Sequence, residues 1–211
     1  MSIVHENISD VTIGNFLLEL GSSAPAPGGG STAALSGAMG AALVSMLCSL
    51  TLGREKYAEY QKINAETKKR SDELIHELTE CISKDMTSYD SVMEALKLPK
   101  GTEKEKALRS ERLQEAYKSA ASAPIETSEK CLEVMKLAYS LTGKSNKTAE
   151  CDLLAAALNA NSGIALANVN VKVNLLYIKD SEYVGKTCYW ADRITREASE
   201  ILKKIREALK A

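Results

Sequence analysis

Aromatic residues, prolines and an excess of charge of either sign are all scarce in this sequence of 211 residues. It has one Trp, one Phe and four Pro, and 27 basic and 28 acidic side chains leave a formal net charge of −1. A nearly neutral chain has no overall field that would attract nucleic acid or an anionic membrane surface. With so few prolines, and with Ala, Leu, Glu and Lys prominent, the composition favours helices. We therefore expect a helical protein whose partners are neither nucleic acids nor membranes.

Histidine and paired cysteine are also rare, which argues against metal sites and disulfides. The two histidines, His5 and His76, are far apart, and the five cysteines contain no Cys-x-x-Cys pair. No group of side chains has the spacing of metal ligands, and no histidine is suitably placed for Ser-His-acid catalysis. An odd number of widely spaced cysteines is typical of reduced thiols. The N-terminus has neither the basic region nor the apolar core of a signal peptide, so we expect a cytoplasmic protein without a bound metal.

Charge is missing altogether between Leu20 and Gly53. Residues 32–52 are long enough to span a membrane, but Ser, Thr, Gly and Ala fill about half of them and no aromatic belt flanks them. An uncharged helix of this kind is also typical of the centre of a soluble bundle. We expect a buried helix in which Gly37 and Gly40, one turn apart, let a neighbouring helix or a dimer partner approach closely.

A glycine-rich loop, Ala24-Pro-Ala-Pro-Gly-Gly-Gly-Ser31, precedes that helix. It ends any earlier helix and places Ser31 where an N-cap is expected. The open N–H groups of Gly28, Gly29 and Gly30, at the positive end of the helix dipole, suit an anionic or carbonyl-bearing ligand. The alternative is that the glycines only make a tight turn before a closely packed helix.

Helical periodicity recurs along the rest of the chain, and no segment has the pattern of a strand. We expect helices over 10–20, 32–52, 55–98, 103–143 with a kink or boundary at Pro124, 148–178 and 182–210. The expected N-terminal caps are Asp10, Thr102 with Glu105, and Thr148. The predicted fold is all-α, a single domain over 1–211 in which about six helices form a bundle around the apolar small-residue helix.

One carboxylate falls on an apolar helical stripe. Steps of three and four residues join Leu74, Leu78, Cys81, Asp85, Tyr89, Val92 and Leu96. A carboxylate on a core-facing stripe is costly unless it is hydrogen-bonded, paired or facing a cavity. The pattern alone leaves two roles open for Asp85, a buried structural hydrogen-bonder or a functional acid.

Five asparagines lie in the otherwise apolar segment between Leu153 and Ile178, whose only charge is Lys172. At about 100° per residue, one face collects Asp152, Asn159, Gly163, Asn170 and Asn174. The opposite side takes Asn161, Asn168 and Lys172. Because asparagine is a poor residue for a helix interior, its recurrence favours a ligand-facing wall over a set of satisfied core amides.

These motifs together resemble those of a known family. The matching segments are Pro27-Gly-Gly-Gly-Ser-Thr-Ala-Ala34, Gly37-Ala-Met-Gly-Ala-Ala-Leu43, Leu50-Thr-Leu-Gly-Arg54, Asp85-x-x-x-Tyr89, Glu94-Ala-Leu-Lys-Leu-Pro-Lys100, Ala123-Pro-Ile125, Asp152-Leu153 and Asn170-x-x-x-Asn174-Leu175. They resemble the cyclodeaminase/cyclohydrolase family of folate enzymes, related to the C-terminal half of formiminotransferase-cyclodeaminase. Asn168 and Lys172 depart from it, since relatives often have aromatic or apolar residues there.

The resemblance implies a helical homodimer with its folate site near the subunit interface. The substrate would be a tetrahydrofolate with a one-carbon unit, usually polyglutamylated, and no cofactor would be tightly bound. Asp85 is then the expected acid/base group and Asp152 the other catalytic candidate. Asn159, Asn170 and Asn174 would join Asp152 in holding the pterin. The N–H groups of Gly28, Gly29, Gly30 and Ser31, together with Arg54, would take the benzoyl-glutamate end.

Two reactions are compatible with the resemblance. The first is hydrolysis of 5,10-methenyltetrahydrofolate to 10-formyltetrahydrofolate, preferred because the chain lacks a formiminotransferase half. The alternative is conversion of 5-formiminotetrahydrofolate to the methenyl form with release of ammonia. A third, remoter interpretation is a non-catalytic helical oligomerisation module with a buried polar ladder.

Overall fold

In the computed structural model, which describes residues 7–210 apart from the side chain of Tyr89, every regular element is helical. His5 and the segment that argues against a signal peptide lie outside these residues. Six α-helices follow one another as α1 (Ile13–Leu20), α2 (Gly29–Thr51), α3 (Gln61–Lys97), α4 (Glu103–Ser140), α5 (Cys151–Leu175) and α6 (Ser181–Leu209). Three short 3₁₀ helices are η2 (Ile8–Asp10), η3 (Glu55–Tyr60) and η4 (Lys147–Ala149). The predicted all-α fold of about six helices is confirmed.

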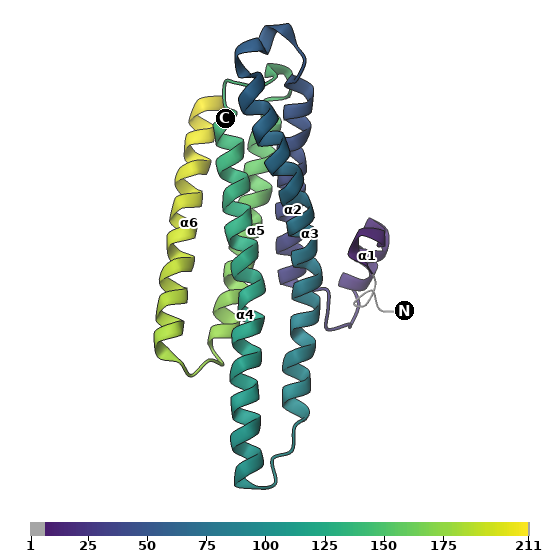
Figure 1. Cartoon of the computed structure of the whole chain (residues 1–211), viewed down its shortest axis with the longest axis vertical. Helices are drawn as coiled ribbons and strands as arrows, with labels where there is room; N and C mark the ends of the chain where they lie inside the picture. Colours follow the sequence, from purple (N-terminus) through teal and green to yellow (C-terminus); the bar gives the residue numbers. More distant parts are fainter. Residues whose placement is uncertain (1–6, 211) are drawn as a thin grey trace.

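The helices form an elongated bundle in which α2 is central. In the view of Figure 1, α2 and α5 lie behind α3 and α4, and α6 runs along the outer side of α4 and α5. The α3–α4 hairpin extends beyond the ends of the other helices (Figure 1). Helix α1 stands to one side and contacts the bundle through buried Phe16, which packs with Cys81 and Met86 of α3. The glycine loop between α1 and α2 therefore lies next to the middle of α3.

Small residues let α2 approach its neighbours as predicted. A Cβ added to Gly40 would lie 2.8 Å from the backbone oxygen of Ala156, and one added to Gly37 would lie 2.5 Å from Cys131 Sγ. Only glycine allows helices to lie this close. Helix α2 is the one described helix long and apolar enough to cross a membrane, but over half of its most apolar window is buried in the bundle, as in the core helix of a soluble protein.

Three predicted caps are wrong. Thr12, not Asp10, caps α1 by accepting the N–H of Asn15. Gly28 is the N-cap of α2, and Ser31 is fully buried inside its first turn. Thr148 lies in η4, and Glu150 is the N-cap of α5 without a side-chain bond. The capping box of Thr102 and Glu105 is confirmed, because both of its bonds are local and need nothing from the tertiary structure.

Pro124 does not divide α4, which is continuous from Glu103 to Ser140. A proline inside a helix has no N–H for the carbonyl four residues before it, here that of Ala120. The Asn174 side chain of α5 donates to this carbonyl oxygen at 3.4 Å. The Asn174 amide thus replaces the hydrogen bond that the backbone of residue 124 cannot donate.

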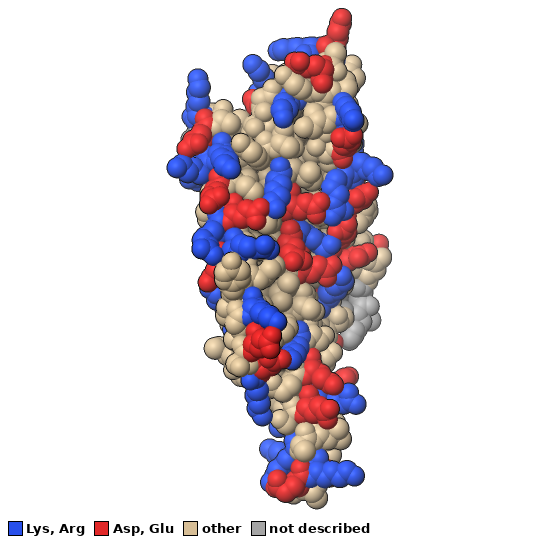
Figure 2. Space-filling model, turned by 60° about the vertical axis from the view of Figure 1, so that its left-hand side comes forward, with Lys and Arg blue, Asp and Glu red and all other residues tan. Residues whose placement is uncertain are grey.

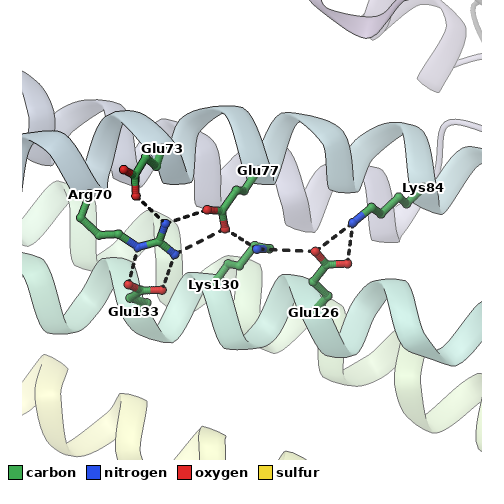
Figure 3. Close-up of polar contacts among 7 residues, drawn as sticks. All are labelled: Arg70, Glu73, Glu77, Lys84, Glu126, Lys130 and Glu133. Atoms are coloured by element: carbon green, nitrogen blue, oxygen red, sulfur yellow. Dashed lines mark hydrogen bonds and ion pairs between the residues drawn. The ribbon is translucent and has the colours of Figure 1, made fainter.

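A charged network joins the outer sides of α3 and α4 (Figure 3). The Arg70 guanidinium donates to Glu133 Oε1 and to Glu77 Oε1, each at 2.6 Å, and Lys130 also donates to Glu77. The full set is Arg70, Glu73, Glu77 and Lys84 of α3 with Glu126, Lys130 and Glu133 of α4. On the face in Figure 2, basic and acidic side chains are interspersed from end to end, so this face has no extended patch of one sign.

Candidate functional site

A cleft of about 420 Å³ opens where the start of α2 meets the middle of α3, α4 and the end of α5. We call it the glycine-loop cleft. Its lining is Pro25, Ala26, Gly28, Gly29, Gly30, Asp85, Ser88, Val92, Met93, Leu96, Tyr117, Ala120, Asn170, Val173, Asn174 and Tyr177. Among these residues Asp85 is the only charged one. The cleft therefore concentrates one negative charge in mostly apolar and amide surroundings.

Asp85 is held against the first turn of α2. Ser31 Oγ donates to Asp85 Oδ2 at 2.8 Å, and the backbone N–H of Ser31 also donates to the carboxylate. Burial nevertheless raises the pKa of Asp85 above its usual value, although the Ser31 bonds act in the opposite direction. A carboxylate whose pKa is raised binds a proton more readily than a free one, so it can both accept and return a proton.

Gly30 is required by the position of Asp85. A Cβ at residue 30 would lie 2.0 Å from Asp85 Oδ1, far inside van der Waals contact. The glycine thus provides space for the carboxylate to approach the positive end of α2, where the helix dipole favours an anion. This interpretation combines the two that the sequence left open, since the loop packs closely and also shapes a polar site.

Asn170 and Asn174 present their carbonyl oxygens as free acceptors. Asn170 Nδ2 donates to Leu166 O at 2.9 Å, and Asn174 Nδ2 donates to Asn170 O at 3.1 Å. Both amide nitrogens are therefore committed to backbone, and neither Oδ1 has a hydrogen bond among the described residues. The two oxygens suit the N–H groups of a polar heterocycle.

The cleft does not include all the residues that the sequence groups together. Asp152 is 18 residues before Asn170, which is about 27 Å along α5, and Asn159 donates its amide to Ala155 of its own helix. Arg54 is exposed and lies beyond Thr51, the last residue of α2, which is about 33 Å from Gly29 along the axis. Within one chain the predicted site is therefore assembled only in part.

Two further residues of α5, Gly163 and Asn168, have structural roles. Gly163, on the same face of α5 as Asp152, is buried where α5 crosses α2, and a Cβ there would lie 2.8 Å from Ala33 O. Asn168 is buried and bonded to Ser128, Thr195 and Ala191 O. The face predicted as a ligand wall is thus interrupted by helix packing, and Asn168 is a satisfied core amide.

The aromatic part of the cleft was not predicted from the sequence. Tyr117 of α4 and Tyr177, just after α5, stack with ring centroids 4.9 Å apart and an interplanar angle of 16°. Both line the glycine-loop cleft. The two tyrosines are 60 residues apart, and periodicity relates only residues of the same helix, so it could not predict that they stack. The scarcity of aromatic residues was the one available signal, because it makes two tyrosines at one site notable.

The chemistry available here is proton transfer and electrostatic stabilisation. No three His, Cys, Asp or Glu side chains within the described residues are grouped so as to hold a metal ion. The cleft combines one acid with a raised pKa, two amide acceptors, a helix N-terminus and an aromatic wall. Such a set suits a flat, partly cationic heterocycle.

Comparisons with known proteins agree with this chemistry. A family model described as Formiminotransferase-cyclodeaminase matches residues 12–191. A methenyltetrahydrofolate cyclohydrolase of Methylorubrum extorquens is 40% identical over 200 residues, which cover 95% of this chain and 96% of that one. The formimidoyltransferase-cyclodeaminase of Mus musculus is 30% identical over 92% of this chain, but this chain covers only 36% of that protein.

The fold also matches a solved structure. The crystal structure of a formiminotetrahydrofolate cyclodeaminase from Thermotoga maritima superposes with a TM-score of 0.85 at 24% sequence identity. The match covers 96% of this chain and 98% of the other. At this identity the likeness shows a shared helical fold.

Proposed function

Because this chain belongs to the formiminotransferase-cyclodeaminase family, we propose that it hydrolyses 5,10-methenyltetrahydrofolate to 10-formyltetrahydrofolate. One observation carries the choice of reaction. The cyclohydrolase relative is 40% identical over nearly the whole of both chains, whereas the mouse cyclodeaminase relative is 30% identical. The interpretation as a non-catalytic module is set aside, since these relatives are named as enzymes.

The charge of the substrate matches that of the cleft. The carbon between N5 and N10 of the methenyl form belongs to an amidinium cation. Asp85 is the only charged residue in the described lining of the cleft, and a carboxylate in a partly desolvated site stabilises a nearby cation more than it would in water. A bound cation would also lower the pKa of Asp85 and favour its basic form.

Asp85 then moves the proton. A water molecule attacks the methenyl carbon, which becomes tetrahedral. As the oxygen of the water bonds to this carbon, the carboxylate accepts a proton from the water. The C–N5 bond breaks, Asp85 returns its proton to N5, and the added hydroxyl loses its proton to solvent as the formyl C=O forms. One water is consumed and one proton is released, so the reaction requires no tightly bound cofactor.

Asn170 and Asn174 hold the pterin in this proposal. Their free Oδ1 atoms accept N–H groups from its amide edge, while the fixed Nδ2 bonds keep both side chains oriented. Asp152, Asn159 and Arg54 are not assigned to this cleft, because they lie far along α5 and α2 from it.

The cyclodeaminase reaction is the second candidate. The raised pKa of Asp85 favours it, because departure of ammonia from the formimino carbon needs a proton donor. In that reaction N10 attacks, and the protonated carboxyl group gives its proton to the leaving nitrogen.

The methenyl chromophore separates the two reactions. Purified protein is supplied with 5,10-methenyltetrahydrofolate or with 5-formiminotetrahydrofolate, and absorbance is followed against the uncatalysed rate. Faster loss of the chromophore from the first supports hydrolysis, and its appearance with ammonia from the second supports the cyclodeaminase. No effect on either folate would overturn both and favour the helical module.

The same proposal includes a homodimer. The exposed sides of α2 and α5 carry Met39, Met46, Leu50, Leu158, Leu166 and Val169 at 37–60% exposure. These adjacent helices carry only two charges between them, those of Asp152 and Lys172, so their outer sides suit a second copy of the chain. Five free cysteines are consistent with the cytoplasm, where we place the protein.

Sedimentation velocity tests the dimer. We expect a dimer for the wild type and a monomer for Met46→Glu, because a carboxylate would be buried at the interface. Tyr189→Glu, on the exposed side of α6, is the matched control and should leave the dimer intact. A monomeric wild type would contradict this part of the proposal.

A further inference from the structure

A second cavity, also of about 420 Å³, adjoins the glycine-loop cleft. The two share the stacked rings of Tyr117 and Tyr177. We call the second cavity the basic pocket. Its lining is Lys100, Lys106, Arg109, Ser110, Leu113, Gln114, Tyr117, Tyr177 and Lys179.

The charges of the two cavities are opposite. The described lining of the basic pocket contains four cationic side chains and no carboxylate, whereas that of the glycine-loop cleft contains only Asp85. Lys106 pairs with Glu103 at 2.7 Å. Lys100, Arg109 and Lys179 have no ion pair among the described residues, so their charge remains available to a ligand.

Arg109 is oriented without being neutralised. Its Nε and Nη2 donate to the backbone carbonyl of Leu96 at 3.3 and 3.1 Å. A carbonyl oxygen holds the guanidinium plane in place but leaves its full positive charge. The side chain of Leu96 lines the glycine-loop cleft, so Arg109 is fixed at the boundary between the two cavities.

The opposite side of the basic pocket is held by Gln114. Gln114 Nε2 donates to Tyr177 O at 2.8 Å, and its Oε1 accepts the backbone N–H of Lys179 at 2.7 Å. Lys179 Nζ donates to Ser110 Oγ at 3.1 Å. These bonds attach the link between α5 and α6 to α4, which reduces the ordering cost of binding a ligand there.

The two cavities follow the order of groups in a folate. Leu96 is eleven residues after Asp85, about 16 Å along α3, with the tyrosine pair lining both cavities. A folate has a pteridine at one end, a p-aminobenzoyl ring in the middle and glutamate carboxylates at the other end. We propose that the basic pocket binds those carboxylates through Arg109 and Lys179, with Lys100 and Lys106 available to further γ-linked glutamates.

This assignment rests on the proposed function and replaces Arg54 as the partner of the glutamate end. The p-aminobenzoyl ring lies beside Tyr117 and Tyr177, whose aromatic faces suit a flat ring. Carboxylates paired with guanidinium and ammonium groups form charge-assisted bonds that are stronger than neutral ones. The glycine N–H groups are likewise reassigned from the glutamate end to the pteridine end, because they line the same cleft as Asp85.

Substrates with and without glutamate test the basic pocket. We expect Arg109→Gln and Lys179→Gln each to raise KM for 5,10-methenyltetrahydrofolate about tenfold, with kcat little changed. KM for 5,10-methenyltetrahydropteroate, which has no glutamate, should not change. Arg112→Gln is the matched control on the same helix, since Arg112 is exposed and pairs with Glu115.

Two results would overturn the assignment. One is an unchanged KM for the glutamylated substrate in both variants. The other is an equal rise for the pteroate analogue, which would indicate a general structural effect. Lys179→Gln keeps the backbone bond to Gln114 and does not touch Leu96, so it is the check against a loss of structure in Arg109→Gln.

A fragment separates this inference from the proposed function. Calorimetry measures binding of p-aminobenzoyl-tri-γ-glutamate, which has no pteridine and is not turned over. Binding to the wild type and Arg112→Gln but not to Arg109→Gln supports the basic pocket even if no folate is converted. Folate conversion with no difference in fragment binding between Arg109→Gln and Arg112→Gln would overturn the basic pocket alone.

Discussion

Glu77 and Asp85 are two carboxylates on the same helix with opposite surroundings. They are eight residues apart on α3, about 12 Å along the axis. Arg70 and Lys130 lower the pKa of Glu77 to about 2. Among the described residues the Asp85 carboxylate has only Ser31 as its partner, and burial raises its pKa.

The difference distinguishes a structural acid from a candidate catalytic one. Cations keep Glu77 ionised across the physiological range, so it joins α3 to α4 and exchanges no protons there. Asp85 is partly desolvated without a cation among the described residues around it, so burial raises its pKa and favours its protonated form more than in water. Buried charge without a cationic partner is costly, and such a cost is typical of functional sites.

The largest expected effect is that of Asp85→Asn. An amide cannot take the proton from water, so kcat should fall by about 10³-fold, while folate binding measured by fluorescence stays within a few fold. Glu77→Gln is the matched control on the same helix and should retain full activity. If Asp85→Asn retained turnover, Asp85 would be only a cap for α2, and Asp152 would become the better candidate.

Gly30→Ala should have the next largest effect. The added Cβ would lie 2.0 Å from Asp85 Oδ1, so the carboxylate must move, and a shift of about 1 Å typically costs about 100-fold in rate. Gly185→Ala is the control, because nothing lies within 4 Å of a Cβ there. Steady-state rates with circular dichroism as a fold check measure this effect, and normal kcat in Gly30→Ala would contradict the assigned place of Asp85.

Ser31→Ala should change the pH profile more than the rate. The Ser31 hydroxyl bond favours the ionised carboxylate and lowers the pKa of Asp85, so its loss should raise that pKa further. If the base form is required, the acidic limb of kcat/KM moves to higher pH, and activity on that limb falls about tenfold. A profile that does not move would mean that another group controls this limb.

Glu77→Gln should affect stability and leave activity intact. The folded-state pKa of Glu77 is about 2 against an ordinary value of 4.5, so its contribution to stability is full above about pH 4.5 and is lost as the pH falls toward 2. We expect a loss of about 1 kcal/mol in the free energy of unfolding at pH 7, which shrinks at pH 3.

Glu66→Gln provides the control for that measurement. Glu66 and Lys62 form a well-exposed pair on the same helix, so its loss should leave urea unfolding unchanged at both pH values. Equal effects of the two substitutions, or a loss in Glu77→Gln that does not depend on pH, would contradict the structural role of Glu77.

The helices were predictable because the signals that define them are local. Periodicity located all six, and the capping box at Thr102 depends on residues three apart. The errors arose where distant residues intervene. Ser31 lies inside the first turn of α2 and donates its hydroxyl to Asp85, 54 residues later. Pro124 lies inside a continuous α4, where Asn174 of α5 donates to the carbonyl of Ala120.

For the candidate site, the sequence predicted which face of a helix each side chain lies on, but not how far apart the side chains lie along the helix axis. The 100° rule placed Asn170 and Asn174 on one face of the helix, and in the structure both line one cleft with Asp85. The same rule grouped Asp152 with them, although about 27 Å of helix separates it from Asn170. Periodicity describes the direction of a side chain and carries no information on which part of the next helix lies opposite.

The amino-acid sequence by itself determined the helical class, the uncharged small-residue helix at the centre and the likeness to a folate enzyme family, because these depend on local pattern and motif. Only the tertiary structure decided that Asp85 has no cation beside it among the described residues, that Gly30 leaves space for its carboxylate, and that Lys and Arg side chains line the neighbouring pocket. Those properties depend on contacts between distant residues that helix packing brings together: Gly30 and Ser31 with Asp85, 54 or 55 positions later, and Lys179 with Arg109, 70 positions earlier. Desolvation and electrostatic pairing depend on distance in space, which a linear pattern does not contain.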